Sequence, residues 1–349
     1  LNLGSGNTTI NAEDVNVNGA VITTGAVDIN AGDTIVFALG GSILVSSGPG
    51  AIDLEAVNNI ELGSLSTSGG DVIVNSTAGA INDANAGAAN INADKATLLA
   101  ATGAGVGNSL ETFITFLEAN IGGGLELDNT TGGNLIIGDA GGLTGITVGG
   151  ASTITTTNGV WVDESITASG GAFELSNAAG NILINNGSII SNTGSNLIHI
   201  DAANQIIMED NGTQVTSSGN GTIDLDAVNN IYLTNINTSG EVQITSTGGQ
   251  ILEISAAETP VITADTVALR AATGIGFPGG SDLDLAINTM AAFTTSGGIA
   301  LQEPSAATIG TVDGLSGITA GGNIALEIGG TLTVNQKIEA TGASSTILA

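Results

Sequence analysis

The chain has 349 residues and a formal net charge of −30, from 33 acidic residues against three Lys and Arg. A surface of this charge repels nucleic acid and anionic lipid, which excludes both as partners. No apolar run is long enough to insert into a membrane as a spanning helix. Hydrophobic residues make up 42% of the chain, aromatic residues only 2%, and cysteine is absent. This composition predicts an ordered, acidic chain of many short strands joined by tight turns.

The first fifty residues alternate between strand and turn patterns. In VDINAGDTIVFAL (residues 27–39), Val27, Ile29 and Ile35 alternate with polar residues. Such alternation points one set of side chains inward and the other toward solvent. The sequence therefore predicts half-buried strands from its first residues onward, and we expect a processed chain or a segment of a longer one.

A long internal duplication organises the rest of the chain. IDLEAVNNI, which begins at Ile52, returns as IDLDAVNNI, which begins at Ile223. Apolar strand positions recur at a regular short spacing within each copy: Ile52, Val72 and Ile91 in the first, and Ile223, Val242 and Val261 in the second. A repeat of roughly 20–25 residues built from short strands and Gly/Asn turns indicates a solenoid.

One stretch in each copy departs from this pattern. LETFITFLEAN at residues 110–120 places apolar residues at a helical period, and LDLAINTMAAF at residues 283–293 is its counterpart. We expect an outward bulge with a helical turn at these two places. Two further short strands are the alternative, because β-branched Thr and Ile suit either structure.

These patterns predict an all-β fold, a parallel β-helix whose strands pair one coil along. The general rule for parallel crossovers makes it right-handed. A single continuous solenoid is expected over residues 1–349, built of two tandem units at about 1–174 and 175–349. At roughly 21 residues per coil the chain would form roughly 16–17 coils and a rod about 80 Å long. Open strand edges at the ends predict pairing with flanking repeats or with copies of the chain itself.

The repeats resemble those of a known family. NIYLTNINTSGEVQITSTGGQI at residues 230–251 and VALRAATGIG at residues 267–276 are similar to the repeat regions of filamentous-haemagglutinin-like exoproteins, large adhesins of Gram-negative bacteria. The resemblance covers essentially the whole chain and is one of repeat style. It implies a right-handed parallel β-helix, an extracellular or cell-surface location, and a role as stalk or fibre. It implies no catalytic residues, and the secretion domain of that family is not recognisable here.

Catalysis is not expected. Parallel β-helices include polysaccharide lyases and hydrolases, which need carboxylates clustered with a base on one face. The bases of this chain are scattered along the sequence: Lys95, Arg270, Lys337 and the single His199. The sequence therefore predicts no enzyme activity, no catalytic residues and no cofactor, and we expect His199 to be an isolated surface residue.

Four acidic residues are the candidates for a metal site. Asp53 and Glu55, and Asp224 and Asp226 in the second copy, alternate with apolar residues and should lie on the outer face. Ca²⁺ could bridge such stacked carboxylates through their oxygens. Solvated acidic strands without a metal are the alternative, and the calcium-binding motifs GGxGxD and the EF-hand loop do not occur.

The function expected from these observations is that of a non-catalytic structural segment. It would be a rigid rod within an extracellular bacterial fibre or giant adhesin, able to stack end to end into a filament. The alternative is a carbohydrate-binding or polysaccharide-cleaving β-helix, for which host or matrix glycans would be the partners.

Overall fold

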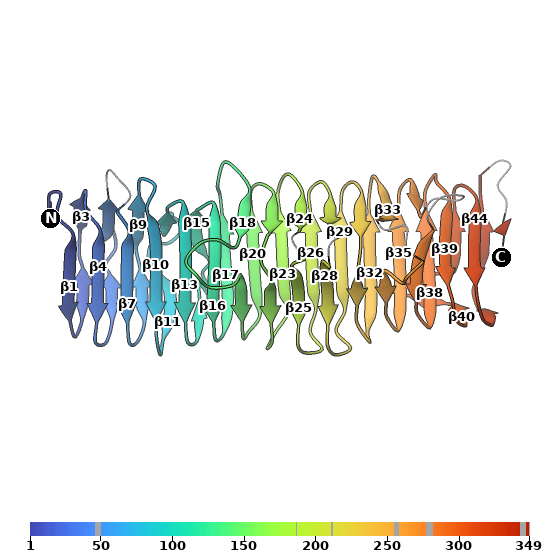
Figure 1. Ribbon diagram of the computed structural model, residues 1–349, viewed down its shortest axis with the longest axis horizontal. Coiled ribbons are helices and arrows are strands. Elements are labelled where there is room, and N and C mark those ends of the chain that lie inside the picture. Colours follow the sequence, from blue (N-terminus) through green and yellow to red (C-terminus); the bar gives the residue numbers. More distant parts are fainter. Residues whose placement is uncertain are drawn as a thin grey trace. The chain divides into compact units, whose positions relative to one another are not determined.

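The computed structural model describes residues 1–45, 50–185, 187–210, 212–254, 258–276, 282–342 and 347–348. Within these residues every regular element is a β-strand, and the parallel strands stack coil upon coil as a β-solenoid (Figure 1). The chain contains about 14 such turns in all. The predicted fold class is confirmed. The chain divides into two compact units, Leu1–Gly171 and Ala172–Ala349, which are described separately. That they form one continuous solenoid stays a prediction.

The number of turns is lower than the sequence spacing predicts, because many coils are longer than the assumed repeat. The shorter kind of coil places Val72 opposite Ile52. Longer coils place Ile52 opposite Val27 and Ala96 opposite Val72, with several more residues between the two partners. The sequence spacing was taken from the shorter coils, so it overestimates how many coils the chain can form.

Strands make up most of both units. Those of unit 1 are β1 (Thr8–Ala12), β2 (Val15–Val17), β3 (Ala20–Thr23), β4 (Val27–Ala31), β5 (Ile35–Phe37), β6 (Ser42–Val45), β7 (Ile52–Ala56), β8 (Ile60–Leu62), β9 (Ser64–Thr67), β10 (Asp71–Ser76), β11 (Ala80–Asp83), β12 (Ile91–Asn92), β13 (Lys95–Ala100), β14 (Gly103–Ala104), β15 (Leu110–Phe113), β16 (Phe116–Ile121), β17 (Gly124–Asn129), β18 (Leu135–Ile137), β19 (Ile146–Val148), β20 (Ser152–Thr156), β21 (Val160–Val162) and β22 (Ile166–Ala168). Those of unit 2 are β23 (Phe173–Asn177), β24 (Ile182–Ile184), β25 (Ile189–Asn192), β26 (Ile198–Ala202), β27 (Ile206–Met208), β28 (Gln214–Ser217), β29 (Ile223–Ala227), β30 (Ile231–Leu233), β31 (Ile236–Asn237), β32 (Glu241–Ser246), β33 (Gln250–Glu253), β34 (Ile262–Thr263), β35 (Thr266–Ala271), β36 (Gly274–Ile275), β37 (Leu283–Ala286), β38 (Thr289–Thr294), β39 (Ile299–Glu303), β40 (Ala307–Ile309), β41 (Thr311–Val312), β42 (Leu315–Ser316), β43 (Ile318–Ala320), β44 (Ile324–Ile328), β45 (Leu332–Val334), β46 (Ile338–Ala340) and β47 (Ile347–Leu348).

Columns of aliphatic side chains fill the interior of each unit. One column of unit 1 runs across successive strands and holds Ile10, Ile29, Leu54, Val74, Leu98, Ala119, Ile146 and Ile166. A column of unit 2 likewise holds Phe173, Ile198, Ile223, Val242, Val267, Met290 and Ile309. All but Ile10 in these two lists are at most 2% exposed. Each coil therefore buries its neighbours' side chains, as stacking repeats must.

Asparagines form ladders at the turns, as their side chains allow. In unit 2, Nδ2 of Asn229 donates to Oδ1 of Asn204 at 2.6 Å, and Nδ2 of Asn204 donates to Oδ1 of Asn181 at 2.7 Å. Oδ1 of Asn59 in unit 1 accepts from the backbone N–H of Ala80 one coil along. These bonds satisfy turn groups that a strand ladder leaves unpaired.

The two irregular stretches are strands, so the expected helical turn is wrong and the strand alternative is confirmed. Residues 110–120 form β15 and β16, and residues 283–293 form β37 and most of β38. β16 pairs with β13 along its whole length, and β38 pairs with β35 along its whole length. The ladder with the preceding coil overrides the local helical spacing, because pairing satisfies the backbone groups of the strand.

A loop folds over the outer face of the sheet in each unit. In unit 1, residues 138–145 cover Glu118, whose Oε2 accepts from the N–H groups of Gly141 and Leu143 at 2.7 and 2.9 Å. In unit 2, the hairpin β41–β42 replaces this loop, and Val312 packs against Ala268 and Ala291. The same excursion is thus held by a buried carboxylate in one unit and by apolar contact in the other.

A basic side chain also holds each loop. Nζ of Lys95 donates to the carbonyl oxygen of Asp139 at 2.7 Å, and the Arg270 guanidinium donates to that of Asp313 at 2.6 Å. Arg270 also pairs with the Asp313 carboxylate at 2.8 Å. Both aspartates have positive φ, 57° and 46°, so the turn presents its carbonyl outward to the cation.

The buried columns predict a sharp contrast between neighbouring residues of one strand. We expect Leu54→Ala in β7 to lower the free energy of unfolding by about 2–5 kcal/mol, because Leu54 is fully buried between Ile29 and Val74. Urea denaturation followed by circular dichroism measures the change. The control is Glu55→Gln on the same strand, which is exposed and should stay within about 0.5 kcal/mol. Equal effects of the two substitutions would contradict the inward position of Leu54.

Candidate functional site

Asp53 and Glu55, two of the four predicted calcium ligands, lie on the outer side of β7 as expected. Asp53 is half-buried and lies opposite Asp28 of β4, while Glu55 is exposed and lies opposite Asn30. Burial, and then the charges of Asp28 and Glu55, raise the pKa of Asp53. Nδ2 of Asn30 donates to Oδ1 of Asp28 at 2.8 Å. This ladder stacks carboxylates and amides, but it brings no third acidic ligand atom within reach among the described residues.

Asp224 and Asp226, the other two candidates, lie on the outer side of β29 beside His199 of β26. His199 lies directly opposite Asp224, and Glu174 of β23 lies on its other side. Nε2 of His199 is 3.3 Å from Oδ2 of Asp226 and 4.0 Å from Oδ2 of Asp224, and Nδ1 is 3.6 Å from Oε1 of Glu174. We call these four residues the His199 cluster. The imidazole is enclosed by three carboxylates from the coils on either side of it.

The carboxylates hold His199 in its cationic form. The pKa of His199 is raised to about 9, first by the hydrogen bond to Asp226 and against the opposing effect of burial. Asp224 and Glu174 add to this through their charges. The pKa of Asp224 is also raised, to about 6, first by burial and then by the charge of Asp226. At neutral pH the cluster is therefore an imidazolium among carboxylates.

This arrangement suits binding between coils better than proton transfer. A general base works best when its pKa lies near the operating pH, whereas the pKa of His199 is raised to about 9. Nε2 of the imidazolium already makes the contacts with Asp224 and Asp226 that a cation bound there would make. The cluster joins the coils of β23, β26 and β29 through charge-assisted contacts. Ca²⁺ at these two aspartates stays a prediction, and at neutral pH an ion would compete with His199.

The link between His199 and its carboxylates is the feature that sequence analysis missed. The sequence predicts an isolated surface residue at His199, because the duplication alone does not show which residues lie one coil away from it. Glu174, His199 and Asp224 are equally spaced in the sequence, and their spacing is the local length of the coil. Reading the sequence at that interval would have placed the three side chains in one outward row.

The fold and these outer ladders define the chain as a parallel β-solenoid with an acidic exterior. Comparisons with protein-family models, with curated proteins and with solved structures found no match to it. Among the described residues, no helix has the length and apolar character needed to cross a membrane.

The His199 cluster predicts an unusual titration that is easily observed, because the chain contains a single histidine. We expect its imidazole NMR signals to titrate with a pKa of about 9 in the folded protein. Asp226→Asn should lower this midpoint by about one unit or more, because the hydrogen bond to Asp226 is the largest cause of the raised pKa. Glu174→Gln is the control and should lower it less, because the charge of Glu174 is the smallest of the causes that raise it.

Stability should follow the same protonation. The pKa of His199 is raised from 6.5 to about 9 on folding, so its stabilising effect is complete below pH 6.5 and is lost as the pH rises to about 9. The denaturation midpoint of the wild type should fall over this range, whereas that of His199→Asn should fall less. A wild-type midpoint that stays constant over the same range would show that the cluster does not hold the proton.

Proposed function

We propose that the chain is a non-catalytic structural segment of an extracellular bacterial fibre or giant adhesin, acting as a stiff spacer. The observation that carries this proposal is that inward and outward side chains in both units make contacts between successive coils. Inward residues form mainly apolar columns, and several outward charges contact neighbouring coils or loops of the same unit. Lys95 and Arg270 hold loops, and His199 joins three coils.

The physical basis of stiffness is the ladder between coils. Strands pair with the equivalent strands of the next coil, so bending a unit would stretch backbone hydrogen bonds and open the aliphatic columns together. The absence of cysteine and the net charge of −30 fit a protein that stays soluble outside the cell without disulfides. The resemblance of the repeats to bacterial exoproteins supports the same location.

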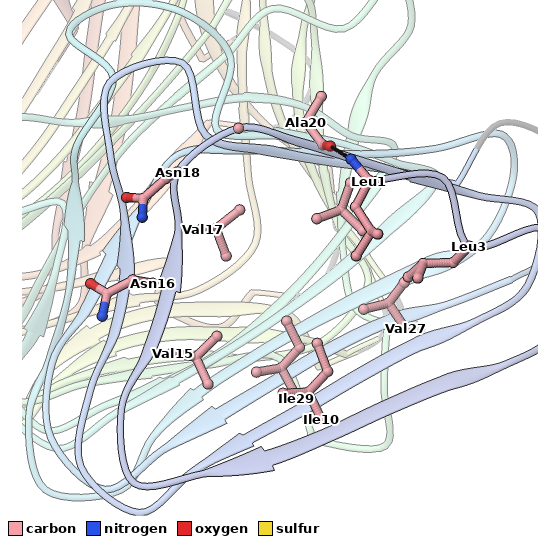
Figure 2. A pocket seen from close by; sticks show the side chains of 12 residues that line it. Leu1, Leu3, Ile10, Val15, Asn16, Val17, Asn18, Ala20, Val27 and Ile29 are labelled. Carbon is pink, nitrogen blue, oxygen red and sulfur yellow. Dashed lines mark hydrogen bonds between the residues drawn. The ribbon is translucent and has the colours of Figure 1, made fainter.

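The first coil of unit 1 offers a surface for a further coil. Figure 2 shows a hollow of about 280 Å³ into which the side chains of Ile10, Val15 and Val17 point, while those of Asn16 and Asn18 point away. The N-terminal amine of Leu1 closes one side by donating to the carbonyl oxygen of Ala20 at 2.7 Å (Figure 2). An aliphatic hollow of this kind fits the side chains of another coil, from a flanking repeat or from a second copy.

Electron microscopy of the purified chain tests this proposal. If the two units continue one another, about 14 turns at about 4.8 Å give particles roughly 65–70 Å long. End-to-end stacking should add multiples of this length as the concentration rises. Val17→Lys places a charge in the hollow and should abolish the longer particles, and the control Asn16→Lys should not. Particles that are never elongated would contradict the role as a spacer.

A second candidate function, carbohydrate binding, is favoured by an apolar row on the outer face of unit 1. Phe116, Ile136 and Trp161 lie opposite one another on β16, β18 and β21, and Lys95 lies over the ring of Phe116 at 5.2 Å. Trp161 is 40% exposed. An exposed aromatic ring such as that of Trp161 can stack on the apolar face of a sugar ring, with Ile136 beside it extending the apolar surface.

Intrinsic fluorescence decides this second candidate, because Trp161 is the single tryptophan of the chain. Neutral oligosaccharides are the appropriate probe, since the net charge repels acidic ones. Binding should shift the emission of Trp161 and saturate, and Ile136→Asp should weaken it about tenfold or more by placing a charge within the apolar row. Ile207→Asp, on the outer face of unit 2, is the control. If the emission is unchanged up to ~10 mM sugar, any dissociation constant is weaker than that, and the row is not a glycan site.

A further inference from the structure

Four carboxylates gather at one corner of unit 2, where β33 ends. They belong to Glu253, Glu258, Asp282 and Asp284, which we call the acidic corner. One ligand oxygen each from Glu258, Asp282 and Asp284 lie within 4.8 Å of one another. Glu253 lies opposite Leu233 of the preceding coil, so it takes an inward position that a leucine fills one coil earlier.

Asp284 is buried without full compensation. It is 4% exposed, and its Oδ1 has no hydrogen-bond partner among the described residues. Its backbone N–H donates to Oε2 of Glu253 at 3.1 Å, and Glu253 is itself only 9% exposed. A buried acceptor without a donor, next to further carboxylates, is costly unless a cation joins them.

The duplicated corner of unit 1 shows how the chain satisfies such a place with its own groups. There Asp83 lies opposite Leu62, as Glu253 lies opposite Leu233. Asp83 accepts from the side-chain amides of Asn90 and Asn108 and from the N–H groups of Asn85 and Ala86. The backbone N–H of Glu111 donates to Oδ1 of Asn90 at 2.9 Å. Amides thus separate the carboxylates of unit 1.

Unit 2 has lost the central amide of this corner. Val261 takes the place of Asn90. The N–H of Leu65 donates to the carbonyl oxygen of Asn90, and the N–H of Ile236 donates to that of Val261 in the same way. Glu253 reaches the N–H of Asp284 directly in its place. Asp284 corresponds to Glu111 of unit 1. Oε2 of Glu111 also lacks a donor, but Glu111 belongs to no group of three acidic ligands among the described residues. Among the described residues, the absence of the amide and the grouping of three acidic ligands therefore occur together at the corner of unit 2.

The basic side chains of unit 2 pair elsewhere. Arg270 pairs with Asp313, and Lys337 pairs with Glu339. His199 lies among the carboxylates of its own cluster. No basic side chain of the described residues forms an ion pair with the acidic corner.

Protonation of the corner is shifted accordingly. Burial is the first cause that raises the pKa of Glu253 to about 7 and that of Asp284 to about 6. The charges of Asp282 and Glu258 add to both, and a backbone hydrogen bond from Thr259 opposes the rise at Asp284.

We propose that Glu258, Asp282 and Asp284 bind a Ca²⁺ ion, with Glu253 positioning Asp284 through its backbone N–H. Ligand oxygens at roughly 2.3–2.6 Å from a Ca²⁺ ion lie within about 5 Å of one another, which agrees with the spacing of these three. Ca²⁺ accepts a flexible set of carboxylates and backbone carbonyls, whereas Mg²⁺ demands a regular octahedron and Zn²⁺ favours nitrogen and sulfur ligands. The site is separate from the four acidic residues predicted from the sequence.

Isothermal titration of the chelator-treated full chain with CaCl₂ tests the proposal. We expect a saturable site with a dissociation constant of ~10⁻⁴ M, the range of extracellular calcium modules. The double substitution Glu258→Gln, Asp282→Asn should weaken it at least tenfold. Both side chains reach solvent, so the fold should be retained, which circular dichroism verifies. Glu111→Gln in unit 1 is the matched control and should leave binding unchanged.

Thermal unfolding gives an independent readout. At a calcium concentration about 100 times the dissociation constant, the Tm of unit 2 should rise by about 5 °C in the wild type. Asp284→Asn should raise the Tm without calcium, because it removes a buried charge, and should abolish the rise with calcium. The proposal is overturned by a lack of saturable binding, by a double variant that binds as the wild type does, or by Mg²⁺ binding as tightly as Ca²⁺.

Discussion

The constraint on which the structure depends is the parallel register between coils. Each strand residue lies opposite the residue that holds the same position one coil along, so like positions stack on like positions. For inward positions this is favourable, because Ile29, Leu54 and Val74 extend one aliphatic column. For outward positions the same register stacks carboxylates, as it does for Asp28 and Asp53. The same register therefore stabilises the interior of each unit and brings like charges together on the exterior of a chain with a net charge of −30.

The exterior solves this problem with different groups at different places. On the outer face of unit 1, Asn30 donates an amide hydrogen to Asp28, and the buried Asn90 donates one to Asp83 at a corner. His199 supplies a positive charge between the coils of unit 2, and Arg270 supplies another to the hairpin above β35. The duplication makes these choices comparable: the buried Glu118 that holds the loop of unit 1 is replaced in unit 2 by contacts of Val312 with Ala268 and Ala291. The backbone is kept while the side-chain solution changes.

Much of the fold could be predicted from the sequence, because the apolar residues of the inward columns recur along the chain. Alternation at Ile52 and Leu54 and its return at Ile223 indicated the strands, the parallel pairing and the outer position of Asp53 and Asp224. The helical turn at residues 110–120 could not be judged, because a local period says nothing of the strand one coil away with which β16 pairs. The His199 cluster escaped for the same reason: coil length varies along the chain, so outward neighbours follow from register rather than from a fixed spacing.

The separation of interior and exterior has a consequence for how the chain can change. An inward substitution disturbs a column that every coil shares, whereas an outward substitution is felt by the residues one coil to either side. The polar groups at a corner can therefore differ between the units with the column intact, as the buried Asn90 and its counterpart Val261 show. Where the change removes an amide and leaves Glu253, Asp282 and Asp284 together, the fold persists because Ile251 and Leu283 beside them remain fully buried. Binding properties can arise at such corners while the coil that carries them stays the same.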